Sequence, residues 1–268
     1  MPQWIPMFTL PNITMTESIE GEGIALVSTA DARLAEVCEA YPAFKKFVAC
    51  FKTEFGRSVA PTFILCHEEA PPSFRTVDAL AAFRDAVSMS VVPHSWARAL
   101  RYNGPFGGIF YSNWFHIYPW SLDKNYEHLV MMTLATNAIH EVARLRGQSS
   151  PGISPRHLDM VDVDHTLLNV LLERWQRAFR TDTPEHDDVA LFRSLNMANS
   201  AALLPAGPEA TMYDIGRSVA LWVSAFEILA PAKSQGSRST TCFERSNTSF
   251  PNVLALPMSP TGIHKPSG

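Results

Sequence analysis

Apolar residues recur at intervals of three and four over much of the chain, which is the pattern of amphipathic helices. Asp31 is an expected N-cap for a helix that runs toward Phe51, and Pro42 should break or kink it. A further helix is predicted to begin at Thr76 or Asp78 and to stop at Pro93. The first half of the chain is therefore predicted to contain several helices.

Other segments of the first half favour extended structure. The runs 24–27 and 62–66 are short and β-prone, as buried strands are. The aromatic stretch 109–120 follows a glycine-rich turn and is predicted to form one or two strands. After it, the apolar spacing predicts a helix from Ser121 or Asp123 to Leu145.

The segment 147–155 is rich in Gly, Ser and Pro and is predicted to be a linker. Beyond it, Asp164 can cap a helix that reaches Phe179, and two more helices are predicted over 187–202 and 209–229. The last of these is apolar on most sides, so we expect it to run through the middle of a bundle.

These patterns predict a mainly α protein. The C-terminal half is expected to be a helical bundle, and the N-terminal half is helical with a few short β-strands, in an α+β arrangement. The expected divisions are an N-terminal region over 1–148, a helical bundle over 157–230, and a tail over 231–268. The tail is rich in Pro, Ser, Thr and Gly and is predicted to be disordered, or a truncation or altered reading frame.

Composition narrows the class of protein. The chain is 46% hydrophobic and 18% charged, with a net charge of -4, so a packed core is expected and no overall positive field would attract a polyanion. Its four cysteines lack metal-knuckle spacing. The start, Met1–Leu10, lacks the basic region of a signal peptide, and Val219–Leu229 is too short to span a bilayer. We therefore expect a cytoplasmic protein with no membrane partner.

Several clusters could carry chemistry, and each has a structural alternative. The group of His157, Asp159, Asp162, Asp164 and His165 has ligand types that suit divalent metals, but its spacing matches no known motif and Asp164 serves as an N-cap. We therefore predict no metal and no cofactor.

The histidines and the basic clusters also have both a functional and a structural interpretation. His116, His128 and His140 recur every twelve residues, which rotates a helical side chain by about 120°, so His128 and His140 would not share a face. The basic clusters 144–146 and 174–177 are predicted to be solvated helix faces, with nucleic-acid contact as the alternative.

Two segments resemble the helical core of HEPN-type proteins. They are 191–198, with the sequence Leu-Phe-Arg-Ser-Leu-Asn-Met-Ala, and 213–229, a tryptophan-bearing helix that ends in Phe226, Glu227 and aliphatic residues. The resemblance covers about residues 160–230. It implies a helical bundle from a superfamily that includes ribonucleases and non-catalytic members, many of them in prokaryotic defence or stress systems.

Active members of that superfamily carry an arginine followed after four to six residues by a histidine. Arg180 and His186 are the pair with that spacing here. The resemblance implies that His186 would act as general acid or base on a ribose hydroxyl, while Arg180 would stabilise charge on the phosphate, in a metal-independent ribonuclease. The pair precedes the tryptophan-bearing helix, whereas the family pair is expected later.

The leading hypothesis is thus a HEPN-like helical protein that is catalytically degenerate or truncated and acts through RNA-linked or partner binding, with a homodimer as one form. A second hypothesis is a protein-interaction scaffold without enzymatic activity, which binds through an incompletely covered apolar face. A third is a small-molecule enzyme with a pocket near the aromatic stretch 109–120.

Overall fold

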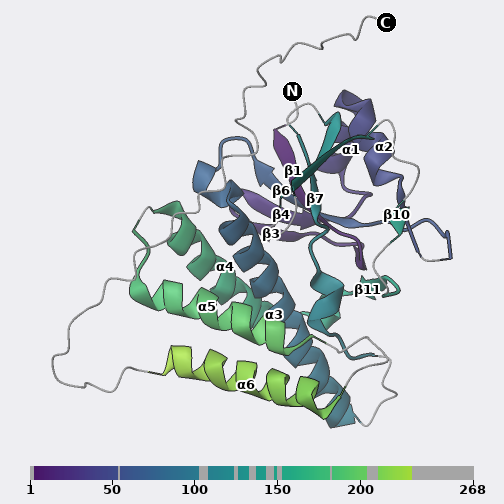
Figure 1. The fold of residues 1–268 in the computed structure, drawn as a ribbon. Coiled ribbons are helices and arrows are strands. Elements are labelled where there is room, and N and C mark those ends of the chain that lie inside the picture. Colours follow the sequence, from purple (N-terminus) through teal and green to yellow (C-terminus); the bar gives the residue numbers. More distant parts are fainter. Residues whose placement is uncertain are drawn as a thin grey trace, which may run out of the picture. The chain divides into compact units, whose positions relative to one another are not determined.

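The computed structural model describes residues 3–53, 55–102, 108–123, 126–132, 137–142, 148–149, 153–181, 183–203 and 211–230. The chain divides into two units, Met1–Ala232 and Lys233–Gly268, and all of the described residues belong to the first. That unit has a mixed α+β architecture (Figure 1).

A four-stranded antiparallel sheet forms its centre. The strands follow the order β1 (Trp4–Leu10), β6 (Thr62–His67), β4 (Ile24–Val27) and β3 (Ile19–Gly21). All of β4 and the first five residues of β6 are buried. Their continuous apolar sequences therefore reflect burial on both faces of the sheet.

Successive side chains of the two central strands enter different cores. In β4, Leu26 belongs to one hydrophobic cluster and Val27 to the other. In β6, Ile64 joins the cluster of Leu26, while Phe63 joins that of Val27. Because side chains alternate across a strand, each face of the sheet must be covered by a separate layer.

Helices α1 (Ala32–Ala40) and α2 (Pro42–Val48) share the cluster of Phe63 and Val27. Helices α3 (Val77–Tyr102), α4 (His165–Arg180) and α5 (His186–Ala201) contribute to the cluster of Leu26 and Ile64. Helix α6 (Met212–Leu229) packs mainly on α5 (Figure 1).

Shorter elements complete the unit. Parallel pairs join β2 (Ile13–Met15) to β11 (Arg156–Leu158) and β5 (Phe51–Lys52) to β10 (Gln148–Ser149). A separate antiparallel sheet contains β7 (Trp120–Leu122), β8 (His128–Met132) and β9 (Asn137–Glu141). Single 3-10 turns occupy Pro72–Arg75, Ser112–Phe115 and Met160–Asp162.

Several predicted boundaries are confirmed. Asp31 caps α1 and Asp164 caps α4, each accepting a hydrogen bond from a backbone N–H of the first turn. Pro42 begins α2 one residue after the C-cap of α1. The runs 24–27 and 62–66 are the central strands β4 and β6.

The predicted helix from Ser121 or Asp123 to Leu145 is wrong, because its first part contains β7, β8 and β9. Asp123 does not cap a helix. Its carboxylate accepts the backbone N–H groups of Glu127 and His128, at 2.8 and 3.2 Å, and so closes the turn between β7 and β8. Burial of Leu129 in the cluster of α1 and α2 stabilises the strand.

The aromatic stretch 109–120 was expected to be extended, but it contains a 3-10 turn at Ser112–Phe115 and only reaches a strand at Trp120. The predicted stop at Pro93 is also wrong, since α3 continues to Tyr102. Pro93 lies on an exposed side of the helix, where loss of one backbone hydrogen bond leaves the buried face intact.

The predicted regions 1–148 and 157–230 do not have separate hydrophobic cores. Leu26, Phe83 and Trp175 share one hydrophobic cluster although they come from both sides of the expected linker. The prediction that the last helix runs through the middle of a bundle is likewise wrong, because most of α6 is exposed on the side away from α5. None of the described helices has the length and hydropathy of a bilayer span.

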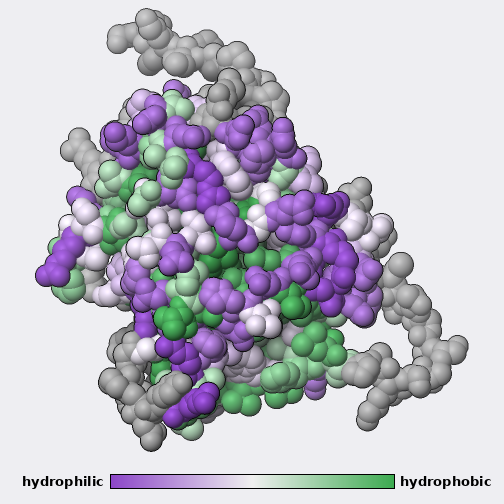
Figure 2. Space-filling model, turned by 180° about the vertical axis from the view of Figure 1, so that it is seen from behind, coloured by the Kyte–Doolittle hydropathy of each residue, from purple (hydrophilic) through white to green (hydrophobic). Residues whose placement is uncertain are grey.

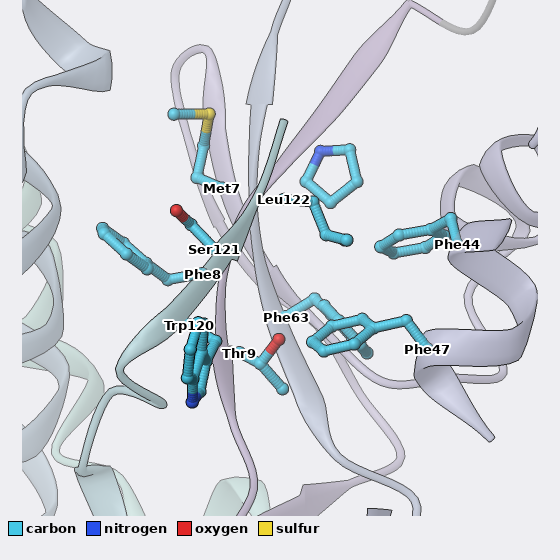
Figure 3. A pocket seen from close by; sticks show the side chains of 10 residues that line it. Met7, Phe8, Thr9, Phe44, Phe47, Phe63, Trp120, Ser121 and Leu122 are labelled. Atoms are coloured by element: carbon cyan, nitrogen blue, oxygen red, sulfur yellow. The ribbon is translucent and has the colours of Figure 1, made fainter. Parts of the chain in front are cut away.

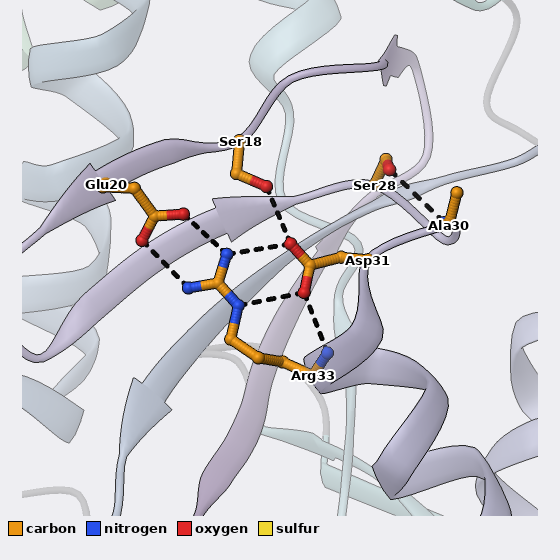
Figure 4. A network of polar contacts seen from close by, with 6 residues as sticks. All are labelled: Ser18, Glu20, Ser28, Ala30, Asp31 and Arg33. Carbon is orange, nitrogen blue, oxygen red and sulfur yellow. Dashed lines mark hydrogen bonds and ion pairs between the residues drawn. The ribbon is translucent and has the colours of Figure 1, made fainter.

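A polar network holds the start of α1 against the edge strand β3 (Figure 4). Asp31 accepts hydrogen bonds from Ser18, at 2.8 Å, and from the backbone and side chain of Arg33, at 2.9 Å. Arg33 also reaches both carboxylate oxygens of Glu20 and lies 4.9 Å from the ring centre of Trp4. The Arg33 side-chain hydrogen bond, above all, lowers the pKa of Asp31 to about 2.

This pKa predicts the pH range in which the network contributes to stability. A carboxyl group whose pKa is lowered by folding stabilises the protein above its ordinary pKa of 3.8, and the contribution is lost as pH falls toward about 2. The difference in unfolding free energy between the wild type and Asp31→Asn should therefore be largest near neutral pH and shrink below about pH 4. Urea denaturation at several pH values would measure it, and a difference unchanged down to pH 2 would contradict the assignment.

Trp175 provides a second prediction, because it is 0% exposed where α3 meets α4. Its indole N–H donates to the carbonyl oxygen of Ala79 at 2.7 Å, and its ring lies 4.5 Å from that of Phe74. Trp175→Ala should lower the unfolding free energy by about 3–5 kcal/mol. Val170→Ala, on the same helix but at a side chain 52% exposed, should change it by less than about 0.5 kcal/mol. Equal effects in urea denaturation would show that the core is misplaced.

Candidate functional site

Arg180 and His186 flank the connection from α4 to α5, but they have different partners. The Arg180 guanidinium forms an ion pair with Glu22 at 2.5 Å, and the His186 imidazole, 94% exposed, lies 3.6 Å from the Asp187 carboxylate. Both residues belong to the described part of the chain, and no hydrogen bond or ion pair joins them there. Among the described residues, the two side chains are therefore held by different carboxylates, Glu22 and Asp187.

The two arginines of the basic cluster 174–177 form ion pairs with one buried carboxylate. Asp188, in the first turn of α5, is 0% exposed and pairs with Arg174 and with Arg177, the latter at 2.8 Å. Hydrogen bonding from Arg177, and then from Arg174, lowers the pKa of Asp188. This pairing joins α4 to α5. Because the Arg174 and Arg177 side chains are still 31% and 49% exposed, the cluster is a partly solvated helix face, as its sequence predicted, and also a tie between the two helices.

A second polar group, absent from the sequence analysis, lies between α3 and α5. Asp85 is 1% exposed, and burial raises the pKa of its carboxyl group. One carboxylate oxygen accepts from Arg84 at 2.7 Å and the other from Asn196 at 3.1 Å. The sequence signal was an Arg–Asp pair inside an apolar helix. Because both oxygens are engaged, the group fixes the helix contact and leaves no oxygen aimed at a substrate.

One helical turn further along this contact, Ser88 donates to the Asn199 amide oxygen at 2.9 Å. Ser88 and Asn199 are both buried. The α3–α5 contact is therefore polar as well as apolar, and its polar atoms satisfy one another.

The histidine and aspartate residues of 157–165 make separate contacts. His157 pairs with Asp159 at 3.1 Å, and His165 lies 3.0 Å from the Met160 carbonyl oxygen. Asp162 pairs with Arg98 at 2.9 Å, on α3. Within the described ranges no three side chains of metal-ligating type converge.

The structure places two of the three histidines of the twelve-residue series on strands, His128 in β8 and His140 in β9. His128 pairs with Asp123 at 2.8 Å, on the turn before β8. His140 lies in β9 rather than on a helix and is the register partner of Leu129. Gly104, Gly107 and the basic cluster 144–146 lie outside the described residues.

Three residues of the aromatic stretch belong to the hydrophobic core, so their rings are not available to stack on a ligand. Phe110, Phe115 and Tyr118 are buried. A small hollow beside Trp120 is bordered by β1, β7 and α2, with Phe8 and Phe47 in its wall (Figure 3). Its enclosed space fits about one water molecule. It is too small to bury a small-molecule substrate, which requires a cleft of roughly 300 Å³ or more.

Exposed apolar side chains form a stripe along α6. We call it the α6 stripe, and it consists of five side chains that are between 49% and 78% exposed: Met212, Ile215, Val219, Val223 and Phe226. Intervals of three and four residues place all five on one side of the helix. Hydrophobic residues gather along the lower edge of the molecule, where α6 lies in Figure 1 (Figure 2).

The opposite side of α6 is used for packing within the chain. Ser194 on α5 donates to the carbonyl oxygen of Ala225 at 2.8 Å, and Ser218 donates to that of Ala201 at 2.5 Å. Ala225 is 2% exposed. Small side chains let α5 and α6 approach closely, and this contact leaves the stripe directed away from the core.

Comparison with known proteins provides no relative from which a role could be transferred. No family model, no curated protein and no solved structure matches the chain.

The different partners of Arg180 and His186 lead to a prediction about catalysis. Purified protein carrying Arg180→Ala or His186→Ala should cleave single-stranded RNA at the same rate as the wild type, because each side chain is paired with a carboxylate of its own rather than with the other. Fluorescent RNA substrates and gel analysis would measure the rates. A loss of roughly tenfold or more in both variants, with unchanged thermal unfolding, would show that the pair is catalytic.

Proposed function

We propose that this chain acts by binding a protein partner through the α6 stripe, and that it does so without catalysis by Arg180 and His186. The observation that carries the proposal is the exposure of five neighbouring apolar side chains on a helix whose other side is packed. Contiguous apolar surface on a soluble protein marks an interaction site more often than scattered exposed residues do.

The chemistry of the stripe favours a protein over a polyanion or a lipid surface. Its five side chains are all uncharged, and Arg217 is the one basic residue of α6. Nucleic-acid and anionic-membrane surfaces are recognised by clustered Lys and Arg, which this helix does not carry. An apolar helix face is the usual half of a helix–helix contact.

The HEPN-like resemblance belongs to the same proposal. The two quoted segments, 191–198 and 213–229, fall on α5 and α6, and these helices pack against each other. We propose that the helices over about 160–230 are a catalytically degenerate HEPN-like helical region within the larger unit, in a prokaryotic defence or stress system, in which partner binding remains. The separate contacts of Arg180 and His186 support degeneracy.

A photo-crosslinking amino acid placed at Val223 in the full chain tests the binding surface. In native cells it should form a covalent adduct with a protein, because the stripe would be covered. A probe at Val170 provides a matched control, since this valine is also on a helix and is 52% exposed compared with 49% for Val223. Adducts at both sites in equal yield, or at neither, would contradict the proposed function.

A further inference from the structure

Two short strands place a hydroxyl group and an imidazole side by side. Strands β2 and β11 pair in parallel, with Thr14 opposite His157. The neighbouring side chains of β2, Ile13 and Met15, are buried, and so is Leu158 of β11. Because successive side chains alternate across a strand, Thr14 and His157 point together away from the core.

The hydroxyl, the imidazole and a carboxylate form a continuous series of polar contacts. Oγ1 of Thr14 lies 3.3 Å from Nδ1 of His157, and Nε2 of the same ring lies 3.1 Å from the Asp159 carboxylate. An ionised carboxylate only accepts hydrogen bonds, so it holds the imidazole hydrogen on Nε2 and leaves the lone pair of Nδ1 directed at the hydroxyl. The Thr14 hydroxyl also reaches the carbonyl oxygen of Arg156 at 3.4 Å, and both contacts keep it beside the ring.

Contacts with the rest of the fold hold both ends of this series. The buried Thr62 hydroxyl donates to the carbonyl oxygen of Ile13 at 2.7 Å, which ties β2 to the central strand β6. The backbone N–H of Asp159 donates to the Asp162 carboxylate at 3.4 Å, and Asp162 pairs with Arg98 of α3 at 2.9 Å. The three groups are therefore supported by the sheet and by α3, as a site that relies on geometry requires.

We propose that Thr14, His157 and Asp159 form an acyl-transfer site, which hydrolyses activated carboxylic esters. A nucleophile, a base and a group that orients the base are the parts that such chemistry needs. Oγ1 of Thr14 forms a bond to the carbonyl carbon of the ester, and its proton passes to Nδ1 of His157. The bond to the leaving group then breaks, and the leaving group takes that proton.

The second half of the reaction restores the site. Water attacks the carbonyl carbon of the acyl-threonine and gives a proton to Nδ1 of His157. The bond between that carbon and Oγ1 breaks, the carboxylic acid leaves, and His157 returns the proton to Oγ1. The net reaction is the hydrolysis of the ester, and it needs no co-reactant other than water.

The exposure of the site sets the class of ester. The side chains of His157 and Asp159 are 46% and 61% exposed, so a substrate can reach them from solvent. Negative charge that develops on the carbonyl oxygen is then stabilised mainly by water, which is weaker than a preorganised, water-excluded site. We therefore expect reaction with esters whose leaving group is a weak base, such as thioesters and aryl esters, and no cleavage of amides.

This activity goes beyond the proposed function and lies elsewhere in the fold. The acyl-transfer site is formed by β2, by β11 and by the residue that follows β11, whereas the α6 stripe lies on a helix that packs mainly on α5. Partner binding and ester hydrolysis can therefore be tested separately, and failure of one leaves the other unaffected.

Hydrolysis of p-nitrophenyl acetate by the purified full chain tests the site. The wild type should release nitrophenolate faster than buffer, and acid-quenched samples should carry one acetyl group on the peptide that contains Thr14, as measured by mass spectrometry. Thr14→Val keeps the side-chain shape but should lose the adduct, and both Thr14→Val and His157→Gln should lower kcat/KM by about tenfold or more. Thr14→Ser should retain the adduct and the activity.

Asp159 is a positioning residue, because it acts on the ester only through the imidazole. Asp159→Asn should lower kcat by about threefold to tenfold and leave KM unchanged. Asp159→Glu, which keeps the carboxylate, should restore part of kcat.

His128 provides a matched control, because its imidazole also pairs with a carboxylate, that of Asp123 at 2.8 Å, and is 36% exposed. His128→Gln should leave the rate and the adduct unchanged. Wild-type activity in folded Thr14→Val would show that another group reacts with the ester, and this would overturn the proposal. Equal effects of His157→Gln and His128→Gln, or a wild type no faster than buffer, would also overturn it. The exposed position of His157 keeps its variant folded and the test decisive even where Thr14→Val does not fold.

Discussion

Burial of the central strands on both faces is the constraint from which the rest of the structure follows. β4 and β6 carry apolar side chains toward both sides of the sheet, so neither face can meet water. α1 and α2 cover one face, and α3 with α4 and α5 contribute to the core on the other. The linker-like segment 147–155 therefore lies between residues that share one core, and it does not separate two domains.

Helix α6 is not needed to cover the central sheet, because other helices already pack on both faces. One side of α6 contacts α5 through Ser218 and Ala225. Its other side presents apolar residues to water, which the folding of this unit does not require. Among the described residues no element packs on this face, and we attribute its apolar composition to a partner that binds it. The polar groups elsewhere on the helices, such as Asp85 and Asp188, are engaged in holding helices together.

The sequence predicted the elements whose signals are local. Asp31 and Asp164 cap helices because the carboxylate accepts a hydrogen bond from a backbone N–H of the next turn, and this contact does not depend on distant parts of the chain. The spacing of apolar residues gave a wrong prediction where contacts between distant segments determine the secondary structure. Residues 128–132 have apolar spacing compatible with a helix, but pairing with β7 and β9 makes them a strand. The candidate pair Arg180–His186 met only a spacing rule, and spacing does not fix side-chain partners. The exposure of α6 could not be read from its composition, because a helix apolar on most sides looks the same in a core as at an interface.

Hydrogen–deuterium exchange of the full chain, purified and in an extract of its native cells, tests the central claim, that the α6 stripe is a surface another protein covers. Backbone amides of α6 should exchange more slowly in the extract than in the purified protein, while those of α4 should exchange at the same rate in both. Exchange in α6 that is equally fast in the purified protein and in the extract would contradict the account.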